Sequence, residues 1–473
     1  MSTLTTAPRR RGSELRLLVF AVLVAMAAYA AVGLAHDARV DEQVLGYGLG
    51  LAVLYGVAHA AVRAFAPAAD PLILPIAALL NGVGLVVIHR LDIAVADRAR
   101  QNGNAVPDAL APLQLLWTAA GVLLFVALLA VIRDHRVLDR YRYTIAAVGL
   151  GLVLLPAVLP ARISSFNGAR IWIRVAGFSI QPAEFGKLAL IVFFASYLVA
   201  KREVLSLATR RVAGLNLPRA RDLGPVLLAW LTSLAVLVRE RDLGSSLLFF
   251  GIFIVMLYIA TERTSWLLIG IALFSGGAFM AYRLFDHVQQ RVLTWVDPFD
   301  PVRIGRGGFQ LTQGLFGLAA GGIAGRGLGR GQPESVPYAS TDFIFASIGE
   351  ELGLIGLVAV LVLFALLVAR GIRVGIGVRD DFGKLLAGGL AFAVALQVFV
   401  VAGGVTRLIP LTGLTLPFIS YGGSSLVANF VLVALLLRIS DAGRSPTADP
   451  PGPPDKSDLT GTMTQVTPRG DAR

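Results

Sequence analysis

Residues 17–35 read LLVFAVLVAMAAYAAVGLA, a run of 19 residues without one charged side chain. A helix needs roughly 20 apolar residues to cross a hydrocarbon core of about 30 Å, so this run is long enough to span a membrane. It is too long for the core of a signal peptide and lacks a convincing cleavage site, which favours a retained helix.

Similar runs recur along all 473 residues, of which 56% are hydrophobic and only 15% charged. Because backbone groups in lipid must bond within their own segment, these runs predict an all-α, polytopic transmembrane helix bundle. We expect about twelve spans, at residues 17–35, 45–65, 71–91, 112–132, 143–160, 183–200, 223–239, 243–261, 265–285, 342–369, 383–403 and 423–438.

The placement of basic residues predicts the orientation. The net charge of +12 comes largely from Lys and Arg in short loops that flank apolar runs, a pattern of cytoplasmic loops rather than of nucleic-acid binding. With twelve spans, both termini and the connections 133–142, 201–222 and 370–384 fall on the cytoplasmic side. The chain has no cysteine, which excludes disulfides and thiolate metal sites.

Longer segments then face outward, at 92–111, 161–182, 286–341 and 404–422. The segment 286–341 is rich in glycine, and its stretch 309–320 is apolar enough to lie in the interface or to re-enter the membrane. The tail after residue 439 has six prolines and few apolar residues, which predicts a disordered cytoplasmic extension.

Two acidic clusters lie where spans are expected to begin. Glu184 and Lys187 are three residues apart on one helix face and can pair. This pair is either a structural clamp, with a carboxylate that the helix dipole favours, or one wall of an anion site. Asp242 lies between two spans. It belongs either to a solvated turn or to a membrane-surface site where a carboxylate can act as a general base.

The long outer segment 286–341 contains a second kind of candidate. Arg291 and Arg326 carry forked donors that suit phosphate, and the neighbouring glycines let backbone amides approach an anion. Trp295 lies between these arginines. The alternative is a flexible basic loop that contacts lipid headgroups. No Walker-type Gly-Lys-Ser/Thr sequence is present, so we expect no nucleotide.

The last cluster combines Asp342, the pair Glu350 and Glu351, and the stretch PFISYGGSS at 417–425. Adjacent carboxylates about two turns inside a span are not expected to face lipid. The alternative for the Gly/Ser stretch is a contact between helices through small residues. These residues predict an outward-facing polar cavity for a lipid-linked anion, and leave open whether the protein is an enzyme or a transporter.

Six of these stretches, in this order, resemble the SEDS family (shape, elongation, division and sporulation), which includes RodA and FtsW. They are NGARIW at 167–172, QPAEFGK at 181–187, DLG at 242–244, GRGLG at 325–329, TDFIF at 341–345 continuing to GEELG at 349–353, and PFISYGGSS at 417–425.

The resemblance implies a peptidoglycan glycosyltransferase that polymerises lipid II, the undecaprenyl-diphosphate disaccharide-pentapeptide, with inversion at the sugar carbon. It implies that Asp242 is the catalytic base. A divalent cation, Mg²⁺ or Mn²⁺, is a further expectation for the departing diphosphate, and a class B penicillin-binding protein is the expected partner. The predicted substrate-binding residues are Arg170, Trp172, Glu184, Lys187, Arg291, Trp295, Arg326, Asp342, Ser420 and Ser424.

Departures from the family pattern set the predicted domains. Residues 1–69 would add two transmembrane helices to a ten-span glycosyltransferase core at 70–438, followed by the tail at 439–473. The added helices, with GGVTRLIP at 403–410, resemble the actinobacterial RodA type. That favours elongation over an FtsW-like role at the division septum. A lipid II flippase and a scaffold for a transpeptidase remain the alternatives.

Overall fold

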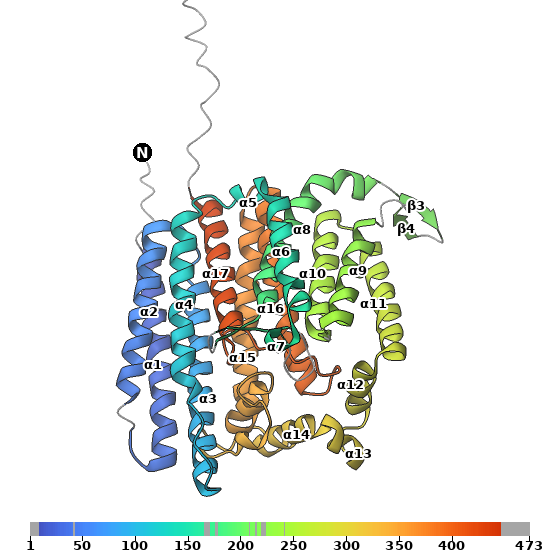
Figure 1. Ribbon diagram of the computed structural model, residues 1–473. Coiled ribbons are helices and arrows are strands. Elements are labelled where there is room, and N and C mark those ends of the chain that lie inside the picture. Colours follow the sequence, from blue (N-terminus) through green and yellow to red (C-terminus); the bar gives the residue numbers. More distant parts are fainter. Residues whose placement is uncertain are drawn as a thin grey trace, which may run out of the picture.

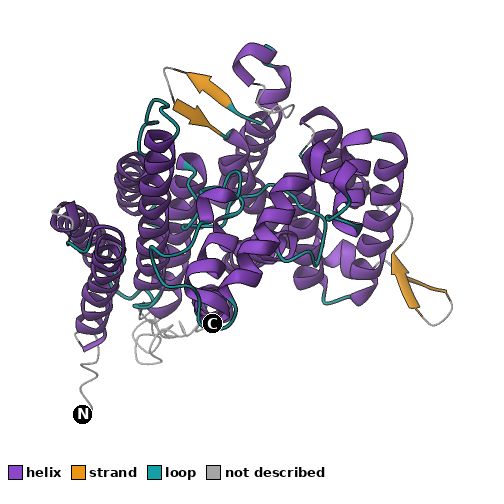
Figure 2. Cartoon of the chain, turned by 90° about the horizontal axis from the view of Figure 1, so that it is seen from below, coloured by secondary structure: helices purple, strands orange, loops and turns teal. Residues whose placement is uncertain are grey.

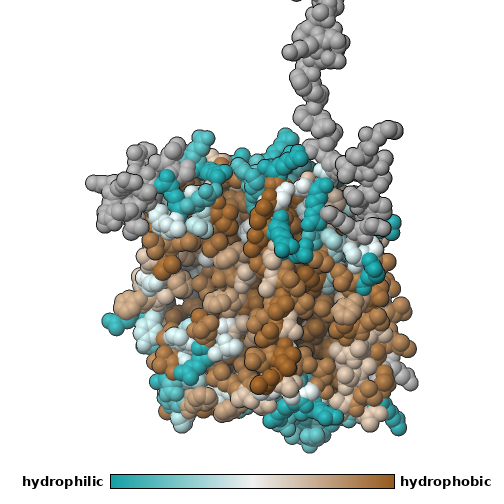
Figure 3. Space-filling view, turned by 180° about the vertical axis from the view of Figure 1, so that it is seen from behind, coloured by the Kyte–Doolittle hydropathy of each residue, from teal (hydrophilic) through white to brown (hydrophobic). Residues whose placement is uncertain are grey.

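The computed structural model describes residues 9–40, 43–164, 171–175, 178–207, 209–212, 215–218, 224–240 and 242–445. Within these residues the protein is a bundle of long helices standing side by side (Figure 1). On the face that Figure 3 shows, hydrophobic residues cover the middle of the bundle and hydrophilic residues gather toward both of its ends. The predicted all-α membrane bundle is therefore confirmed.

Ten helices in the described part of the chain are long and apolar enough to cross a membrane. They are α1 (Arg9–Asp37), α2 (Gln43–Phe65), α3 (Ile73–Gln101), α4 (Leu110–Val131), α8 (Pro182–Leu207), α10 (Leu243–Thr261), α11 (Thr264–Leu284), α15 (Ile344–Gly377), α16 (Asp381–Val405) and α17 (Gly423–Arg444).

The remaining two predicted spans are also helices, α6 (Arg142–Val158) and α9 (Gly224–Glu240), but each has only 17 residues. The bounds differ most where polar residues continue a helix. The third helix extends ten residues past its predicted end at 91, and the last extends six residues past 438. Hydropathy defines the apolar part of a helix and not the polar turns that lengthen it at the membrane surface.

The predicted outer segment 286–341 is mostly helical, so a flexible basic loop is not what these residues form. It contains α12 (Asp286–Val296), α13 (Pro301–Arg303), a π-helical turn at Ile304–Gly308, α14 (Phe309–Gly321) and a 3₁₀ turn at Pro333–Ser335. The helices α12, α13 and α14 lie together at one end of the bundle (Figure 1). We call this end the α14 face. At the opposite end, α1 begins and α17 ends.

Short extended segments were not predicted. Strands β1 (Ile173–Val175) and β2 (Phe178–Ile180) form one antiparallel pair, and β3 (Thr209–Val212) and β4 (Leu215–Pro218) form another. Two short helices, α5 (Val137–Arg140) and α7 (Ala161–Ser164), complete the described elements. The two strand pairs lie at the periphery of the bundle when it is seen from the α14 face (Figure 2).

The helices differ sharply in burial. The apolar window of α17 is 94% buried, whereas that of α11 is 17% buried. Helix α17 contacts α3, α4, α8, α15 and α16, and thus occupies the centre of the bundle. Helices α1 and α2 stand at one edge, where α1 packs on α3 and α2 packs on α4 (Figure 2).

Helix α15 is interrupted at Gly353, whose φ of +66° is favourable only for glycine. The interruption is stabilised by the chain that follows α14. The amides of Leu354 and Ile355 donate to the carbonyls of Gly322 and Ile323, at 3.0 and 3.1 Å. The family-like sequence GEELG therefore forms the last turn before this break, with Glu350 and Glu351 directed at the same connection.

Candidate functional site

Asp242 caps the start of α10. One carboxylate oxygen, Oδ1, accepts hydrogen bonds from the amides of Gly244 and Ser245 at 2.9 and 3.2 Å, and Oδ2 accepts from the Ser245 hydroxyl at 2.5 Å. Aspartate is a preferred N-cap because its carboxylate binds the unpaired amides of the first turn. Asp242 is 6% exposed, which excludes the solvated turn considered above.

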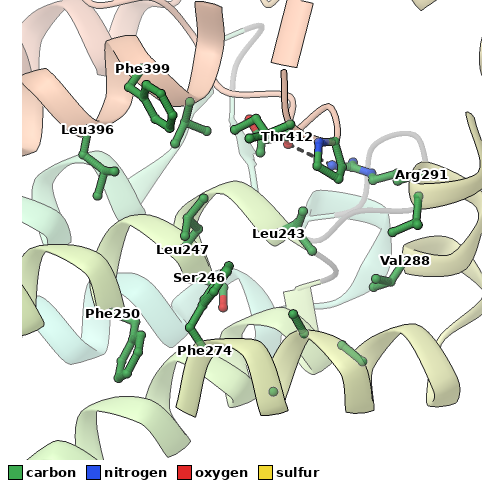
Figure 4. A pocket seen from close by; sticks show the side chains of 17 residues that line it. Leu243, Ser246, Leu247, Phe250, Phe274, Val288, Arg291, Leu396, Phe399 and Thr412 are labelled. Carbon is green, nitrogen blue, oxygen red and sulfur yellow. Dashed lines mark hydrogen bonds between the residues drawn. The ribbon is translucent and has the colours of Figure 1, made fainter. Parts of the chain in front are cut away.

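A cavity of about 400 Å³ lies directly beside this helix start, between α10, α11, α12 and α16. Its lining is almost entirely apolar, with Phe250, Phe399 and Leu396 on one side (Figure 4). Arg291 and Thr412 lie on the other side. Leu243 and Ser246, from the first turn of α10, also line it, and so we call it the Asp242 cavity. An apolar space with a guanidinium group at one side suits a long apolar chain with an anionic head.

Helix α12 is attached to the segment that follows α16. The Arg291 guanidinium donates to the carbonyls of Leu411 and Thr412 at 3.1 and 2.9 Å. The Trp295 indole donates to the Arg407 carbonyl at 3.0 Å, and the Arg407 side chain donates back to the Trp295 carbonyl at 2.8 Å. Both predicted residues therefore hold the wall of the Asp242 cavity in place, and Arg291 also faces into it.

The predicted pair of Glu184 and Lys187 exists and is buried, with 2.8 Å between Nζ and Oε2. The Lys187 ammonium also donates to Oε1 of Gln397 at 2.7 Å, and the Gln397 amide donates to the Thr415 carbonyl at 2.9 Å. These bonds connect α8, α16 and the segment before α17. Gln397 was not among the predicted site residues, although an amide within an apolar span is a detectable signal.

Two serines of the stretch 417–425 join distant segments. The Ser420 hydroxyl donates to the Thr341 carbonyl at 2.5 Å and accepts from the Leu416 amide at 2.8 Å. The Ser424 hydroxyl accepts from the Gln181 amide at 3.0 Å, at the start of α8. In this structure both serines fix the backbone that surrounds the site.

Asp342 lies just before α15. It accepts hydrogen bonds from the Thr341 hydroxyl at 2.9 Å and from the Gln310 amide at 3.4 Å. Burial raises the pKa of Asp342 above its ordinary value, and these hydrogen bonds and the positive charge of Arg291 counteract that effect only in part. Asp342 therefore holds its proton more readily than an exposed aspartate does.

The glycine-rich connection at 325–332 is folded against α15. The amides of Arg326 and Gly327 donate to the carbonyls of Glu350 and Glu351, at 3.0 and 2.8 Å. The Gly329 amide donates to the carboxylate of Glu351 at 3.2 Å, and the Gln332 amide donates to the carboxylate of Glu350 at 2.8 Å. These four amides are thus directed at protein oxygens, and the expectation that this stretch cradles an anion with its backbone does not match its geometry.

Side chains reinforce the same contact. Arg90 of α3, which is buried, donates to the Glu351 carboxylate and to the Gly331 carbonyl at 2.8 and 2.9 Å. The Arg326 guanidinium lies 3.8 Å from Glu350 and is 44% exposed. Arg326 does not line the Asp242 cavity. Sequence reasoning missed Arg90, although a charged residue within an apolar span suggests a buried partner.

Of the two remaining predicted residues, the structure describes one. Trp172 is half-buried immediately before β1, and Arg170 lies outside the described residues. For a metal, the described residues contain no group of three or more His, Asp or Glu side chains arranged to hold an ion.

Known proteins provide an independent comparison. The family described as "Cell cycle protein", that of FtsW, RodA and SpoVE, matches residues 71–445. Peptidoglycan glycosyltransferase RodA of Mycobacterium tuberculosis (strain ATCC 25618 / H37Rv) is 50% identical over 463 residues, which cover 97% of this chain and 96% of the relative. Stage V sporulation protein E of Bacillus subtilis (strain 168) is 36% identical over 79% of this chain and 98% of its own.

Solved structures agree with the fold. A chain from a peptidoglycan synthase complex, described as coordinating polymerization and crosslinking, has a TM-score of 0.58 and is 26% identical over 76% of this chain and 98% of its own. The rod shape determining protein RodA of Thermus thermophilus has a TM-score of 0.55 over 80% of this chain and 99% of its own. At 24% identity, that second likeness shows the fold alone.

Proposed function

The chain belongs to the FtsW, RodA and SpoVE family of cell cycle proteins and is a multi-pass membrane peptidoglycan glycosyltransferase of the RodA type, and we propose that its reaction takes place beside Asp242. The observation that carries this proposal is a buried carboxylate at the start of α10 next to an apolar cavity with Arg291 at one side.

The cavity suits the donor substrate. Lipid II has a long apolar chain, which the phenylalanine and leucine side chains of the Asp242 cavity can accept. Its diphosphate would then lie toward Arg291, whose forked donors match phosphate oxygens. The hydroxyl groups of Ser246 and Thr412 also line this cavity and can orient the head of the lipid.

The chemistry needs one base and a stabilised leaving group. In the proposed reaction the Asp242 carboxylate takes the proton of the acceptor sugar hydroxyl, and the hydroxyl oxygen attacks the anomeric carbon of the donor. The bond from that carbon to the diphosphate oxygen breaks, and the diphosphate leaves with the electron pair. A single displacement of this kind inverts the sugar carbon and gives a β-linkage from an α-linked donor.

Lys187 has a different role in this proposal from the one expected from the sequence. Its ammonium group is bonded to Glu184 and Gln397 inside the bundle, and so it positions α8 against α16. The diphosphate is left to Arg291. A divalent cation, if one takes part, would be held chiefly by the phosphates, because Mg²⁺ commonly uses one or two carboxylates together with substrate phosphates. Chelation by EDTA tests this, with restored activity after addition of Mg²⁺ or Mn²⁺ as the supporting result.

The orientation in the membrane, the partner and the cellular role are further parts of the proposal. We infer that the α14 face is the outer face, because α1 begins and α17 ends at the opposite, cytoplasmic end with the basic short loops. The likeness to a chain of a peptidoglycan synthase complex supports a class B penicillin-binding protein as partner. The likeness to RodA along nearly the whole chain supports elongation rather than septation.

The test separates catalysis from helix capping. Asparagine caps helices about as well as aspartate, so Asp242→Asn keeps the start of α10 but removes the base. We expect Asp242→Asn to lower the rate of glycan formation from lipid II by roughly 100- to 10,000-fold, the contribution of a general base, with unchanged thermal stability. Asp242→Ala should lose the same activity and also about 1 kcal/mol of stability.

Purified protein with labelled lipid II in detergent provides the assay, with glycan ladders as the readout. Wild-type activity in Asp242→Asn would remove Asp242 as the base. Movement of lipid II across vesicles without any ladder, even with the partner present, would favour a flippase. The acids that proton coupling would require, Glu350 and Glu351, are engaged with the 325–332 connection, which does not favour that alternative.

A further inference from the structure

A second cavity opens on the α14 face, away from α10. It has a volume of about 750 Å³ and lies between α3, the connection to α4, and the segment 334–340. Part of its wall comes from outside the matched family range of 71–445, because His36, Gln43 and Tyr47 also line it. We call it the α3–α4 cavity. The site is therefore completed by the N-terminal helices that this chain adds to the family core.

These added helices are fixed to α3 by aromatic contacts at the cavity. The Tyr29 ring of α1 stacks on His89 of α3 with 4.0 Å between centroids, and its hydroxyl lies 3.2 Å from Nδ1 of that histidine. Tyr47 of α2 lies 5.0 Å from Tyr29 between ring centroids. His89 and Tyr47 both line the cavity, so this wall is partly aromatic.

The segment 338–342 is linked to both cavities. Tyr338, Ala339 and Ser340 line the α3–α4 cavity, and the Ser340 carbonyl accepts from the Tyr421 amide at 2.8 Å. Asp342, two residues further on, is within the field of Arg291, which lines the Asp242 cavity. Residues 338–342 thus connect the wall of the α3–α4 cavity to a carboxyl group that interacts with Arg291.

The charge of the α3–α4 cavity is negative. Its carboxylates are Asp92, Asp97, Asp108 and Glu334. Asp97 is paired with Arg100 and His36, each at 2.9 Å. The Glu334 oxygen Oε2 is buried without a hydrogen-bond partner among the described residues.

Glu334 itself is half-buried, and the carboxylates that line this cavity give it a negative field that a cation would offset. Burial, and after it the charge of Asp92, raises the pKa of the Tyr421 hydroxyl, so the field of Asp92 reaches beyond the cavity.

We propose that the α3–α4 cavity binds an ammonium group carried by the peptide portion of the saccharide substrate. This inference rests on the proposed function, since a lipid-linked disaccharide with a peptide must place that peptide on the same face as its sugar. Carboxylates attract the ammonium group, and the tyrosine rings favour it through cation–π contact. The α3–α4 cavity then selects substrates by the charge of the peptide.

The experiment compares two substrates that differ only in one charge. Lipid II with a free side-chain amine in its peptide is compared with the same lipid II after N-acetylation of that amine. For the wild-type protein we expect acetylation to raise KM about fivefold, the effect of losing roughly 1 kcal/mol of a partly exposed ion pair, with little change in kcat. In the double variant Glu334→Gln, Asp108→Asn, the two substrates should have equal KM.

Glu262→Gln is the matched control. It also removes a carboxylate, but Glu262 follows the far end of α10 and is highly exposed, so the fivefold preference should persist. Equal KM for both substrates in the wild-type protein would overturn the proposal, as would a preference that survives in the double variant. Absence of glycan ladders with either substrate would instead contradict the proposed function, so the two failures are distinguishable.

Discussion

The two halves of the α14 face use buried charge differently. Around Asp242, the charged groups Arg291 and Lys187 fix segments that enclose a cavity, and part of their hydrogen bonding is directed at that wall. Around Glu350 and Glu351, the partners are the amides of the 325–332 connection and the Arg90 guanidinium. The first region encloses space for a substrate, whereas in the second region the charged groups bind other groups of the protein.

This difference shows that a sequence motif alone does not identify which of the two regions can bind a substrate. Both regions contain acids and glycines in stretches that resemble the SEDS family, and each has an arginine beside them. Only the neighbouring cavity separates a region that can hold a substrate from one that holds a loop. Substitutions in each region test whether the two differ in this way.

Removing one partner of the buried pair Arg90–Glu351 should destabilise the protein. The molecules that remain folded should form glycan at the wild-type rate. Because Glu351→Gln leaves a buried guanidinium without its counter-charge, we expect a loss of about 3–5 kcal/mol. Unfolding in detergent measures this loss, and glycan formation per folded molecule should stay unchanged. Arg326→Met is the control, since its exposed pair should contribute less than about 1 kcal/mol. A large fall in kcat with unaltered stability would move this region into the catalytic site.

Gly353→Ala should be the next largest effect. The φ of +66° is strained for alanine, and an added Cβ would lie 2.3 Å from the Gly325 amide nitrogen. We expect a loss of at least about 2 kcal/mol from the left-handed backbone and the displaced loop. Gly377→Ala, at the end of the same helix, has open space around its Cβ and should leave the unfolding temperature unchanged. Equal stability of both variants would contradict the described contact.

Gln397→Leu should show whether the polar contacts beside Asp242 position the catalytic groups or only stabilise the fold. It keeps Lys187 paired with Glu184 but removes the link to the Thr415 carbonyl, so the wall of the Asp242 cavity shifts. We expect a fall in kcat of about tenfold, because small displacements of positioned groups are costly. Asn81→Leu removes a comparable buried amide, bonded to Thr118 at 3.1 Å, and should lose similar stability with normal kcat. Identical kcat in the two variants would place Gln397 outside the site.

Asp342 should give the smallest effect, visible in the pH dependence of stability. Its folded pKa is raised above the ordinary value of 3.8, so its carboxyl favours the folded state at low pH, and that contribution is lost as pH rises through the folded pKa. Asp342→Asn should therefore be more stable than wild type at neutral pH, with the difference vanishing below about pH 4. A difference that is independent of pH would contradict this assignment.

Most of the fold was predictable because hydropathy reports spanning helices directly. All twelve predicted apolar runs are helices, although α6 and α9 are shorter than the others that can span. The strand pairs were missed because their three- and four-residue segments carry too little pattern. The helices within 286–341 were missed in part because α12 is held by contacts to Leu411 and Thr412, more than a hundred residues away.

The candidate site was predictable in its residue types but not in its pairings. Glu184 and Lys187 were paired correctly because helical spacing determines their distance. The bond between Arg90 and Glu351 joins positions 261 residues apart, which no local pattern reveals. For the same reason the sequence did not distinguish amides that bind an anion from amides that bind Glu350 and Glu351. The substrate roles of Arg170 and Trp172 stay predictions.

The central position of α17 has a consequence for how the protein is made. This last spanning helix is surrounded by α3, α4, α8, α15 and α16, and it is joined to the first of these by Arg444, which donates to Asp70 at 2.5 Å just before α3. Membrane helices are inserted in the order of synthesis, so the eleven earlier predicted spans enter the bilayer before α17 can pack among them. A chain that is truncated before α17 would lack the helix that joins α3, α4, α8, α15 and α16.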